Sequence, residues 1–283
     1  MAGHREPDPS LLSINTATLW ESCTLRRAVE AIRRHGIRGI APWRDRIAEA
    51  GLREAARILG DSGLVVTGLC RGGMFPAADS RGRQGAIDEN RRAIDEAATI
   101  RARCLVIVAG GLPPGSKDLR GSRLMVRDGL GALLEHARAS GVPVALEPLH
   151  PMYCADRACI NTLAQALDLC DELDPSSSGA IGVVVDVYHV WWDPHLQQQI
   201  ARAGNRRLLG FHICDWLVPT RDLLRDRGMM GDGVIDLPQI RGWMEDAGYG
   251  GMHEVEILSV NHWWKKEPDE VLSMCRMRHQ TAS

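Results

Sequence analysis

Four acidic or imidazole side chains stand at the ends of otherwise apolar segments in the second half of this 283-residue chain. The segments are VPVALEPLH, GVVVDVYH, LLGFHICDW and MHEVEILS, and the residues are Glu147, Asp186, His212 and Glu256. An unpaired carboxylate is costly to bury, so each of these segments needs a partner for its polar residue. Three carboxylates and one imidazole, without a thiolate, suit Mn²⁺, Mg²⁺, Co²⁺ or Zn²⁺, and a shared cation would neutralise the carboxylates together.

The elements that must position these residues alternate along the chain. Eight strand-like apolar runs are separated by amphipathic helical patterns such as TLRRAVEAIRRHG and NTLAQALDLCDEL. This alternation predicts a parallel sheet, and eight units in a chain of this length predict a single-domain (β/α)8 TIM barrel. A doubly wound sheet is the alternative, but no strand is followed by a G-x-G-x-x-G turn. The expected strands are Leu12–Leu19, Ile37–Trp43, Leu64–Leu69, Cys104–Ala109, Val142–Leu149, Ile181–Tyr188, Leu208–Cys214 and Met252–Leu258.

Barrel geometry predicts that the four side chains meet at one end of the barrel. Functional groups of this fold lie at the carboxyl ends of the strands, and side chains alternate between the interior and the helix layer. If Val144 and Leu146 face the helices, Glu147 faces inward, and the same parity turns the other three residues inward. One such residue alone is usually a surface or hydrogen-bonded group, but four at matching positions on consecutive strands favour a shared metal ion.

The same parity gives other expectations for the polar residues nearby. Glu254 lies one layer deeper than Glu256 and is expected to be structural, paired with Arg38 across the barrel. His253 and Asp215 have the opposite parity and are expected to be structural or to support the site from outside.

Composition and charge exclude several classes of function. With 34 Lys and Arg against 36 Asp and Glu, the formal charge is -2, which argues against a nucleic-acid partner. No apolar run is long enough to span a membrane, and the first ten residues lack a signal-peptide core. The eight cysteines are scattered without a C-x-x-C pair, so reduced thiols in a cytoplasmic protein are expected. Residues 1–10 are expected to be loose and residues 11–283 to form the barrel.

Several motifs resemble the sugar isomerase/epimerase superfamily of xylose-isomerase-like TIM barrels, which includes ketose 3-epimerases and inosose dehydratase-like enzymes. They are the strand end at Glu147, the D-x-x-H of Asp186 and His189, the strand residue His212, the segment RGMMGDGVID and the ending AGYGGMHEVEIL. The resemblance covers most of the chain and implies that Glu147, Asp186, His212 and Glu256 hold one divalent metal ion. Mn²⁺ is expected first, with Mg²⁺, Co²⁺ and Zn²⁺ as alternatives.

The resemblance also implies roles around the metal. His189 and Arg227, the latter in R-x-x-x-G-x-G, are expected to contact substrate oxygens. Independently of the resemblance, Arg71 at a strand end and the aromatic residues Trp43 and Tyr153 are expected to contact the substrate. Tyr153 stands where the epimerases carry a further Glu, and the stretch between His212 and Arg227 is longer than theirs. The AP-endonuclease branch needs extra His and Asp ligands, but no D-x-H follows GDGVID, so DNA cleavage is not expected.

The expected reaction is isomerisation or epimerisation of a sugar, sugar phosphate or keto-polyol. Glu147 and Glu256 would move a proton α to a carbonyl through a metal-stabilised enediolate. The alternatives are a lyase on the same scaffold, acting like an inosose dehydratase or on a 3-keto glycoside, and a non-catalytic sugar-binding barrel.

The expected partner is a small carbohydrate, with Trp191 and Trp216 available for stacking on a sugar ring. Lys117 and Arg120 leave a phosphorylated substrate open. The pair Trp263 and Trp264 follows the last strand and is expected either to pack the end of the barrel or to cover a contact in a homo-oligomer, a dimer or a tetramer.

Overall fold

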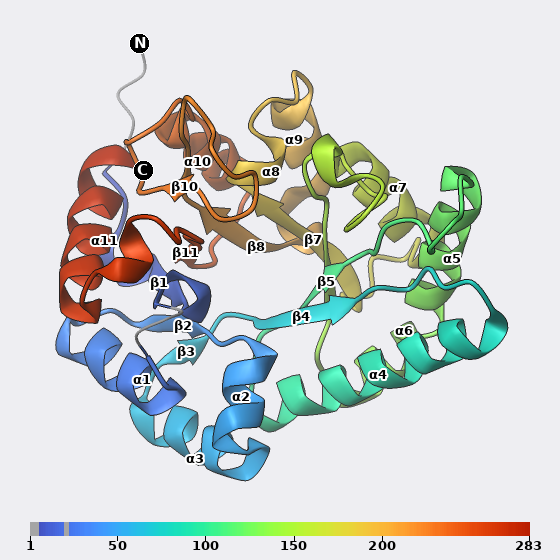
Figure 1. The fold of residues 1–283 in the computed structure, drawn as a ribbon, viewed down its shortest axis with the longest axis horizontal. Helices are drawn as coiled ribbons and strands as arrows, with labels where there is room; N and C mark the ends of the chain where they lie inside the picture. The colour runs from blue at the N-terminus through green and yellow to red at the C-terminus, as the bar shows by residue number, and fades with distance from the viewer. Residues whose placement is uncertain (1–5, 20–22) are drawn as a thin grey trace.

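Nine parallel strands run around the barrel in the order β3-β2-β1-β11-β8-β7-β6-β5-β4 (Figure 1). The computed structural model describes residues 6–19 and 23–283. The barrel strands are β1 (Leu12–Asn15), β2 (Gly39–Ala41), β3 (Val65–Val66), β4 (Leu69–Gly73), β5 (Leu105–Val108), β6 (Val144–Glu147), β7 (Ile181–Asp186), β8 (Leu208–Ile213) and β11 (His253–Val255). The predicted (β/α)8 barrel is therefore confirmed, with its third strand divided in two.

The third predicted strand, Leu64–Leu69, was wrong as a single regular element. The amide of Thr67 bonds to the carbonyl of Ile40 beside β2, at 2.9 Å, whereas the amide of Leu69 bonds to Cys104 beside β5, at 3.0 Å. The neighbouring strand therefore changes from β2 to β5 between Thr67 and Leu69, and the chain continues to Gly73 as the separate strand β4. A bridge between Trp43 and Cys70 brings the two edges of the sheet together and closes the barrel.

Helices surround the strands on the outside (Figure 1). They are α1 (Leu25–Arg34), α2 (Arg44–Ala50), α3 (Leu52–Ser62), α4 (Ser80–Thr99), α5 (Leu119–Gly131), α6 (Leu134–Ser140), α7 (Leu163–Leu173), α9 (Leu196–Arg207), α10 (Leu237–Asp246) and α11 (Pro268–Ala282). Five of them begin after a residue whose side chain accepts a hydrogen bond from the first turn, which satisfies an otherwise unpaired amide. These N-caps are Thr24, Asp79, Asp118, Thr162 and Asp236.

Two of the predicted strands end earlier than expected because a polar side chain starts a helical turn. Asn15 Oδ1 accepts from the amide of Ala17 at 2.9 Å, and a 3-10 turn, η2, follows over Thr16–Leu19. Asp186 Oδ1 accepts from the amide of Tyr188 at 2.9 Å, and the short helix α8 follows over Val187–Val190. A side-chain acceptor two residues before a free amide favours a turn over a further strand pair.

The core has two parts, which confirm the predicted strand parity. Val144, Leu146, Val183 and Val185 belong to the large apolar cluster between the sheet and the helices. A smaller cluster fills the barrel interior and consists of Cys70, Cys104, Val106, Ala145 and Val184. Glu147 and Asp186 have the same parity as Ala145 and Val184, so they face the interior.

A short hairpin follows the last residues of β8. It consists of β9 (Asp215–Trp216) and β10 (Arg227–Gly228).

Near both termini of the chain, a short 3-10 turn flanks the barrel strands, one before β1 and one after β11. Of the predicted loose segment, residues 1–5 lie outside the described residues, while Pro9–Leu11 form the 3-10 turn η1. Trp263, in the 3-10 turn η4 (Trp263–Lys265), is buried, and Trp264 donates from its indole to the carbonyl of Ala17 at 2.7 Å, so both pack within the protomer. Across the described ranges, no helix is long and apolar enough to cross a membrane.

Candidate metal centre

The four predicted ligands converge at the carboxyl end of the barrel. They come from the last residues of β6 and β7, the penultimate residue of β8 and the residue that follows β11. One ligand atom from each lies within 4.8 Å of the others, and all four residues are buried. Because β11, β8, β7 and β6 are consecutive neighbours in the sheet, their ends necessarily meet. The set is Glu147, Asp186, His212 and Glu256.

Two atoms of this set are buried without a hydrogen bond. His212 Nδ1 and Glu147 Oε1 lie 3.0 Å apart, but neither has a hydrogen-bond partner of acceptable alignment among the described residues. Buried polar atoms are normally satisfied, so an unsatisfied pair at one point calls for an explanation. A nitrogen lone pair and a carboxylate oxygen are both metal ligands, and the residues therefore fit a divalent cation.

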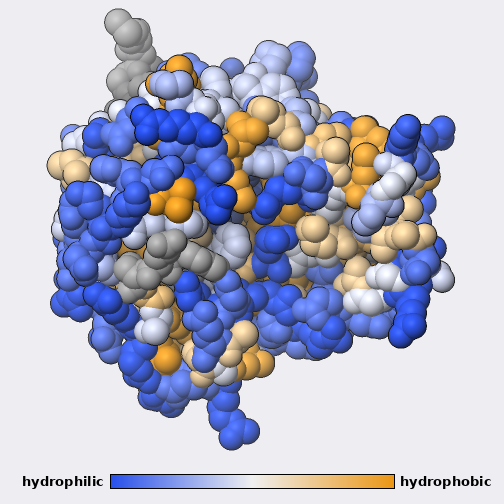
Figure 2. All heavy atoms as spheres, in the orientation of Figure 1, coloured by the Kyte–Doolittle hydropathy of each residue, from blue (hydrophilic) through white to orange (hydrophobic). Residues whose placement is uncertain are grey.

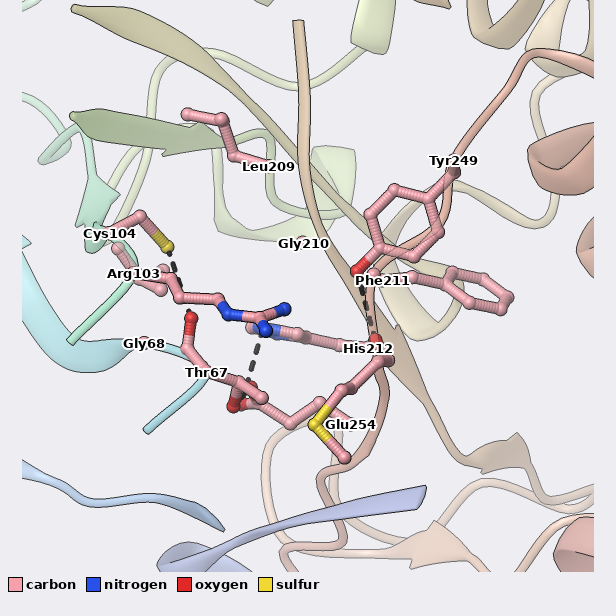
Figure 3. A pocket seen from close by; sticks show the side chains of 13 residues that line it. Thr67, Gly68, Arg103, Cys104, Leu209, Gly210, Phe211, His212, Tyr249 and Glu254 are labelled. Carbon is pink, nitrogen blue, oxygen red and sulfur yellow. Dashed lines mark hydrogen bonds and ion pairs between the residues drawn. The ribbon is translucent and has the colours of Figure 1, made fainter. Parts of the chain in front are cut away.

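Glu254 orients His212 from the opposite side of the ring. Glu254 Oε1 lies 3.3 Å from His212 Nε2, and Thr67 donates its hydroxyl to Glu254 Oε2 at 2.7 Å (Figure 3). A carboxylate on one imidazole nitrogen fixes the tautomer, which leaves the other nitrogen as a ligand. The predicted structural partner of Glu254, Arg38, was wrong because Arg38 lies at the start of the strand and is exposed to solvent.

Asn15 joins Glu254 of β11 to Glu256, the residue that follows this strand. Its side-chain amide donates to Glu254 Oε1 at 2.8 Å and to Glu256 Oε1 at 3.0 Å. The pairing of β1 with β11 places Asn15 beside them. Thus Asn15 and Thr67, both from the first half of the chain, support ligands from the second half. Asn15 stood out only weakly in the sequence as a polar strand end, and Thr67 carried no signal there.

Arg227 lies among the predicted ligands rather than apart from them. Its Nη1 is 3.0 Å from both Asp186 Oδ2 and Glu256 Oε2, and its guanidinium stacks 4.5 Å from the centre of the Tyr188 ring. Its Nη2 is 3.2 Å from His189 Nε2. Because arginine only donates, His189 Nε2 accepts, and this histidine is neutral with its proton on Nδ1.

The electrostatics reflect several charges in one buried space. Burial raises the pKa of Glu147 to about 7, against the opposing effect of His212. Burial alone would lower the pKa of His212, but the carboxylates of Glu254, Glu147 and Glu256 outweigh it and raise the pKa well above the ordinary value. Burial lowers the pKa of His189 to about 3, consistent with its neutral form. Positive charge is therefore stabilised where the carboxylates meet.

The remaining predicted site residues lie around this centre. Tyr153 is buried, its ring meets the ring of His189 edge-on at 5.9 Å, and its hydroxyl donates to the carbonyl of Leu223. Trp43 and Arg71, at the ends of the second and third strands, line a hollow of about 330 Å³. The structure therefore places Tyr153 against the centre and the other two at its margin.

Asp215 and His253, whose strand parity is opposite to that of the four predicted ligands, have structural contacts, as expected. Asp215 accepts hydrogen bonds from four backbone amides, those of residues 216, 231, 233 and 235, and so fixes the loop after the β9–β10 hairpin. His253 Nδ1 and His279 Nε2 lie 2.9 Å apart and join β11 to α11.

An aromatic group borders the carboxyl end. The ring of Trp216 lies 4.6 Å from that of Tyr188, 5.0 Å from His150 and 5.9 Å from Trp191. By contrast, the cavity at the amino end, lined by Thr67, Cys104, His212, Tyr249 and Glu254, has a volume of only about 30 Å³ (Figure 3). Small-molecule pockets hold roughly 300 Å³ or more, so this cavity behind His212 is too small for a sugar.

Comparisons with solved structures agree with this architecture. The chain is 59% identical to protein SMc04130 from Sinorhizobium meliloti, with 97% of this chain and 99% of that chain covered and a TM-score of 0.94. The fold is also shared with the IolI protein solved with a zinc atom (20% identity, TM-score 0.80, covering 94% and 95% of the two chains). A third solved structure with the same fold is the 3-keto-D-glucoside 4-epimerase YcjR from E. coli (21% identity, TM-score 0.74, covering 94% of this chain and 99% of that chain).

No curated protein matches the sequence significantly. The sequence model of the xylose isomerase-like TIM barrel family matches residues 29–276, which include all four predicted ligands, Arg227 and His189. With the strand order and the ligand positions described above, this match shows that the chain belongs to the xylose isomerase-like TIM barrel family.

Proposed function

We propose that the protein is a divalent-metal-dependent isomerase or epimerase of a sugar, a sugar phosphate or a related keto-polyol. The observation that carries this proposal is the buried convergence of three carboxylates and one imidazole, with Glu147 Oε1 and His212 Nδ1 unsatisfied. The family supplies the context, since the fold is shared with a 3-keto-D-glucoside 4-epimerase and a D-psicose 3-epimerase.

The oxygen-rich donor set favours Mn²⁺, with Mg²⁺, Co²⁺ and Zn²⁺ as alternatives. Held by Glu147, Asp186, His212 and Glu256, the cation would act as a Lewis acid toward the carbonyl of the substrate. Nδ1 of His212 is the ligand nitrogen in this proposal, because Nε2 faces Glu254.

Glu147 and Glu256 are proposed as the acid and base that move the proton α to the carbonyl. They stand on β6 and immediately after β11, the outer two of four neighbouring strands, and so approach a bound molecule from different sides. Glu256 is held by Asn15 and Arg227, whereas Glu147 has one carboxylate oxygen without a hydrogen bond. Removal by one group and return by the other gives epimerisation, and return to the neighbouring carbon gives isomerisation.

His189 is proposed to donate a hydrogen bond to a substrate oxygen. Its Nε2 is committed to Arg227, and its Nδ1 is buried without a partner among the described residues. Arg227 keeps Asp186 and Glu256 in place and can share its remaining donors with the substrate. Tyr153, Trp43 and Arg71 are proposed as further substrate contacts.

All eight cysteines are free, which suits the cytoplasmic location that we propose. Assembly into a dimer or tetramer stays a prediction.

The decisive experiment compares the wild type with the Glu256→Gln variant. Protein treated with EDTA and reconstituted should hold about one divalent ion per chain. In D2O with a panel of ketoses, the wild type should incorporate solvent deuterium, and Glu256→Gln should lower this rate by about 10²- to 10⁴-fold.

The exposed Glu267→Gln variant is the matched control and should behave as the wild type. Undiminished exchange in a metal-loaded Glu256→Gln protein would overturn the assigned role. Loss of a substituent from the sugar during the incubation would identify a lyase instead, and metal binding without any exchange would favour a sugar-binding barrel.

A further inference from the structure

Two arginines at the carboxyl end of the barrel have no acidic partner. Arg71 lies on β4, and Arg157 lies in the loop that follows β6. Neither side chain makes a hydrogen bond or an ion pair with any described residue, and Nε of Arg157 is buried. Other arginines without an ion pair, such as Arg33, Arg53 and Arg101, are exposed, whereas Arg71 and Arg157 are partly buried. Two partly buried arginines without an ion pair therefore lie at this end of the barrel.

The backbone brings the two segments to the same strand end. On one side of β5, the amide of Met74 bonds to the carbonyl of Val108 at 2.9 Å. On the other side, the amide of Cys159 bonds to the carbonyl of Gly110 at 2.9 Å. Gly111 permits this approach, because a Cβ there would lie 2.3 Å from the carbonyl oxygen of Ala155. The arginines thus flank the end of β5 on segments fixed by hydrogen bonds.

The pair also adjoins the candidate metal centre. The guanidinium of Arg157 lies 5.8 Å from the centre of the Tyr153 ring, which in turn meets the ring of His189 at 5.9 Å. Arg71 lines the hollow of about 330 Å³ together with Trp43, Met74, Asp45 and Glu89, and Glu89 is paired with Arg44. This volume is in the range of small-molecule sites, so there is room for part of a substrate beside Arg71.

Electrostatics make the arrangement costly in the absence of an anion. Burial lowers the pKa of Arg157, and the charges of Arg71 and Arg227 lower it further. The adjacent Asp156 is exposed and offsets this effect only in part, since the net direction is downward. Like charges held together in a partly buried place are relieved when an anion binds between them.

We propose that Arg71 and Arg157 bind an anionic oxygen group, a carboxylate or a phosphate, at the end of the substrate remote from the reacting carbon. Guanidinium groups suit both anions because their planar donors match two oxygens at once. The proposal rests on the proposed function for the sugar part of the substrate. It differs from the sequence-based candidates Lys117 and Arg120, which are exposed near the start of α5.

The test measures binding of unreactive ligands to the metal-loaded protein by calorimetry. The ligands are D-sorbitol 6-phosphate, D-gluconate and neutral D-sorbitol, and the proteins are the wild type, Arg71→Gln and Arg157→Gln. The wild type should bind an anionic ligand at least 10-fold more tightly than sorbitol. Each variant should lose about 10-fold or more of that preference, as expected for one charge-assisted contact.

Arg103→Gln is the matched control, because Arg103 is an exposed arginine at the amino end of the barrel. Circular dichroism confirms that each variant is folded. Equal binding of charged and neutral ligands by the wild type, or an unchanged preference in both variants, would overturn the proposal. The tighter of the two anions identifies the group. Because no turnover is measured, a protein without isomerase activity that still shows the arginine-dependent preference separates this site from the proposed function.

Discussion

The two halves of the barrel share one architecture but differ in what their strand ends carry. In the second half, β6, β7, β8 and the residue after β11 each supply one side chain to the candidate metal centre. In the first half, Asn15 donates to Glu256, Thr67 donates to Glu254 behind His212, and Trp43 and Arg71 line a hollow. One half therefore provides the ligands, and the other provides their orientation and the space beside them.

The difference follows from adjacency in the sheet. Four consecutive parallel strands of the closed barrel aim side chains from their carboxyl ends at one point, where the four ligand atoms lie within 4.8 Å of one another. Side chains of the first half must reach across the interior or lie beside β11, as Thr67 and Asn15 do. On the face of the molecule shown in Figure 2, hydrophilic side chains predominate and apolar ones form small patches.

The largest expected effect comes from a ligand of the second half. Asp186→Asn removes one negative charge from the cluster and should weaken divalent metal binding by roughly 100-fold or more, because affinity depends on the number of charged ligands. Calorimetric titration of EDTA-treated protein measures the change. Asp193→Asn, a partly exposed aspartate a few residues later, is the control. An unchanged affinity would remove Asp186 from the ligand set.

A smaller effect is expected from the residue that links the two halves. Glu254→Gln should weaken metal binding about 10- to 100-fold, the usual result of losing the carboxylate behind a ligand histidine. The geometry of the ligands themselves is preserved, so the stoichiometry should stay at one ion. If affinity does not change, the contact between Glu254 and His212 is only structural.

The contribution of the first half is expected to be smaller still. Thr67→Val keeps the shape but removes the hydroxyl that donates to Glu254 Oε2 at 2.7 Å, and should weaken metal binding about 5- to 10-fold, equivalent to one hydrogen bond. In a Glu254→Gln background the same substitution should have less effect, because the two residues act through one contact. Fully additive effects would show that Thr67 acts independently of Glu254.

The last effect concerns stability toward acid rather than metal affinity and again comes from the second half. Burial lowers the pKa of His253 to about 3 and that of His279 to about 4. The unfolded chain protonates these groups near pH 6.5, so stability should be unaffected above that pH. It should then fall by about 1.4 kcal/mol per histidine for each pH unit down to about pH 4.

Thermal unfolding of the wild type and of the double variant His253→Gln, His279→Gln at pH 7.5 and pH 5 tests this directly. The variant should lose less stability between the two pH values, whatever its stability at neutral pH. An equal loss in both proteins would assign the acid sensitivity to other groups.

The sequence alone determined the barrel and its four candidate ligands. The alternation of strand and helix patterns predicted the fold, and a two-residue period predicted which side chains face inward, because both depend on local geometry. Val183 and Val185 pack on the helices and Asp186 faces inward, as that period requires.

Only the tertiary structure decided which residues face one another across the barrel. Glu254 meets Asn15, Thr67 and His212 instead of Arg38, because the stagger of strands far apart in the sequence sets the level of each side chain. The division of the third strand into β3 and β4 depends on hydrogen bonds to two different neighbours. Likewise, Arg71 and Arg157 adjoin because two loops are fixed to the same strand end, and no local pattern encodes that proximity.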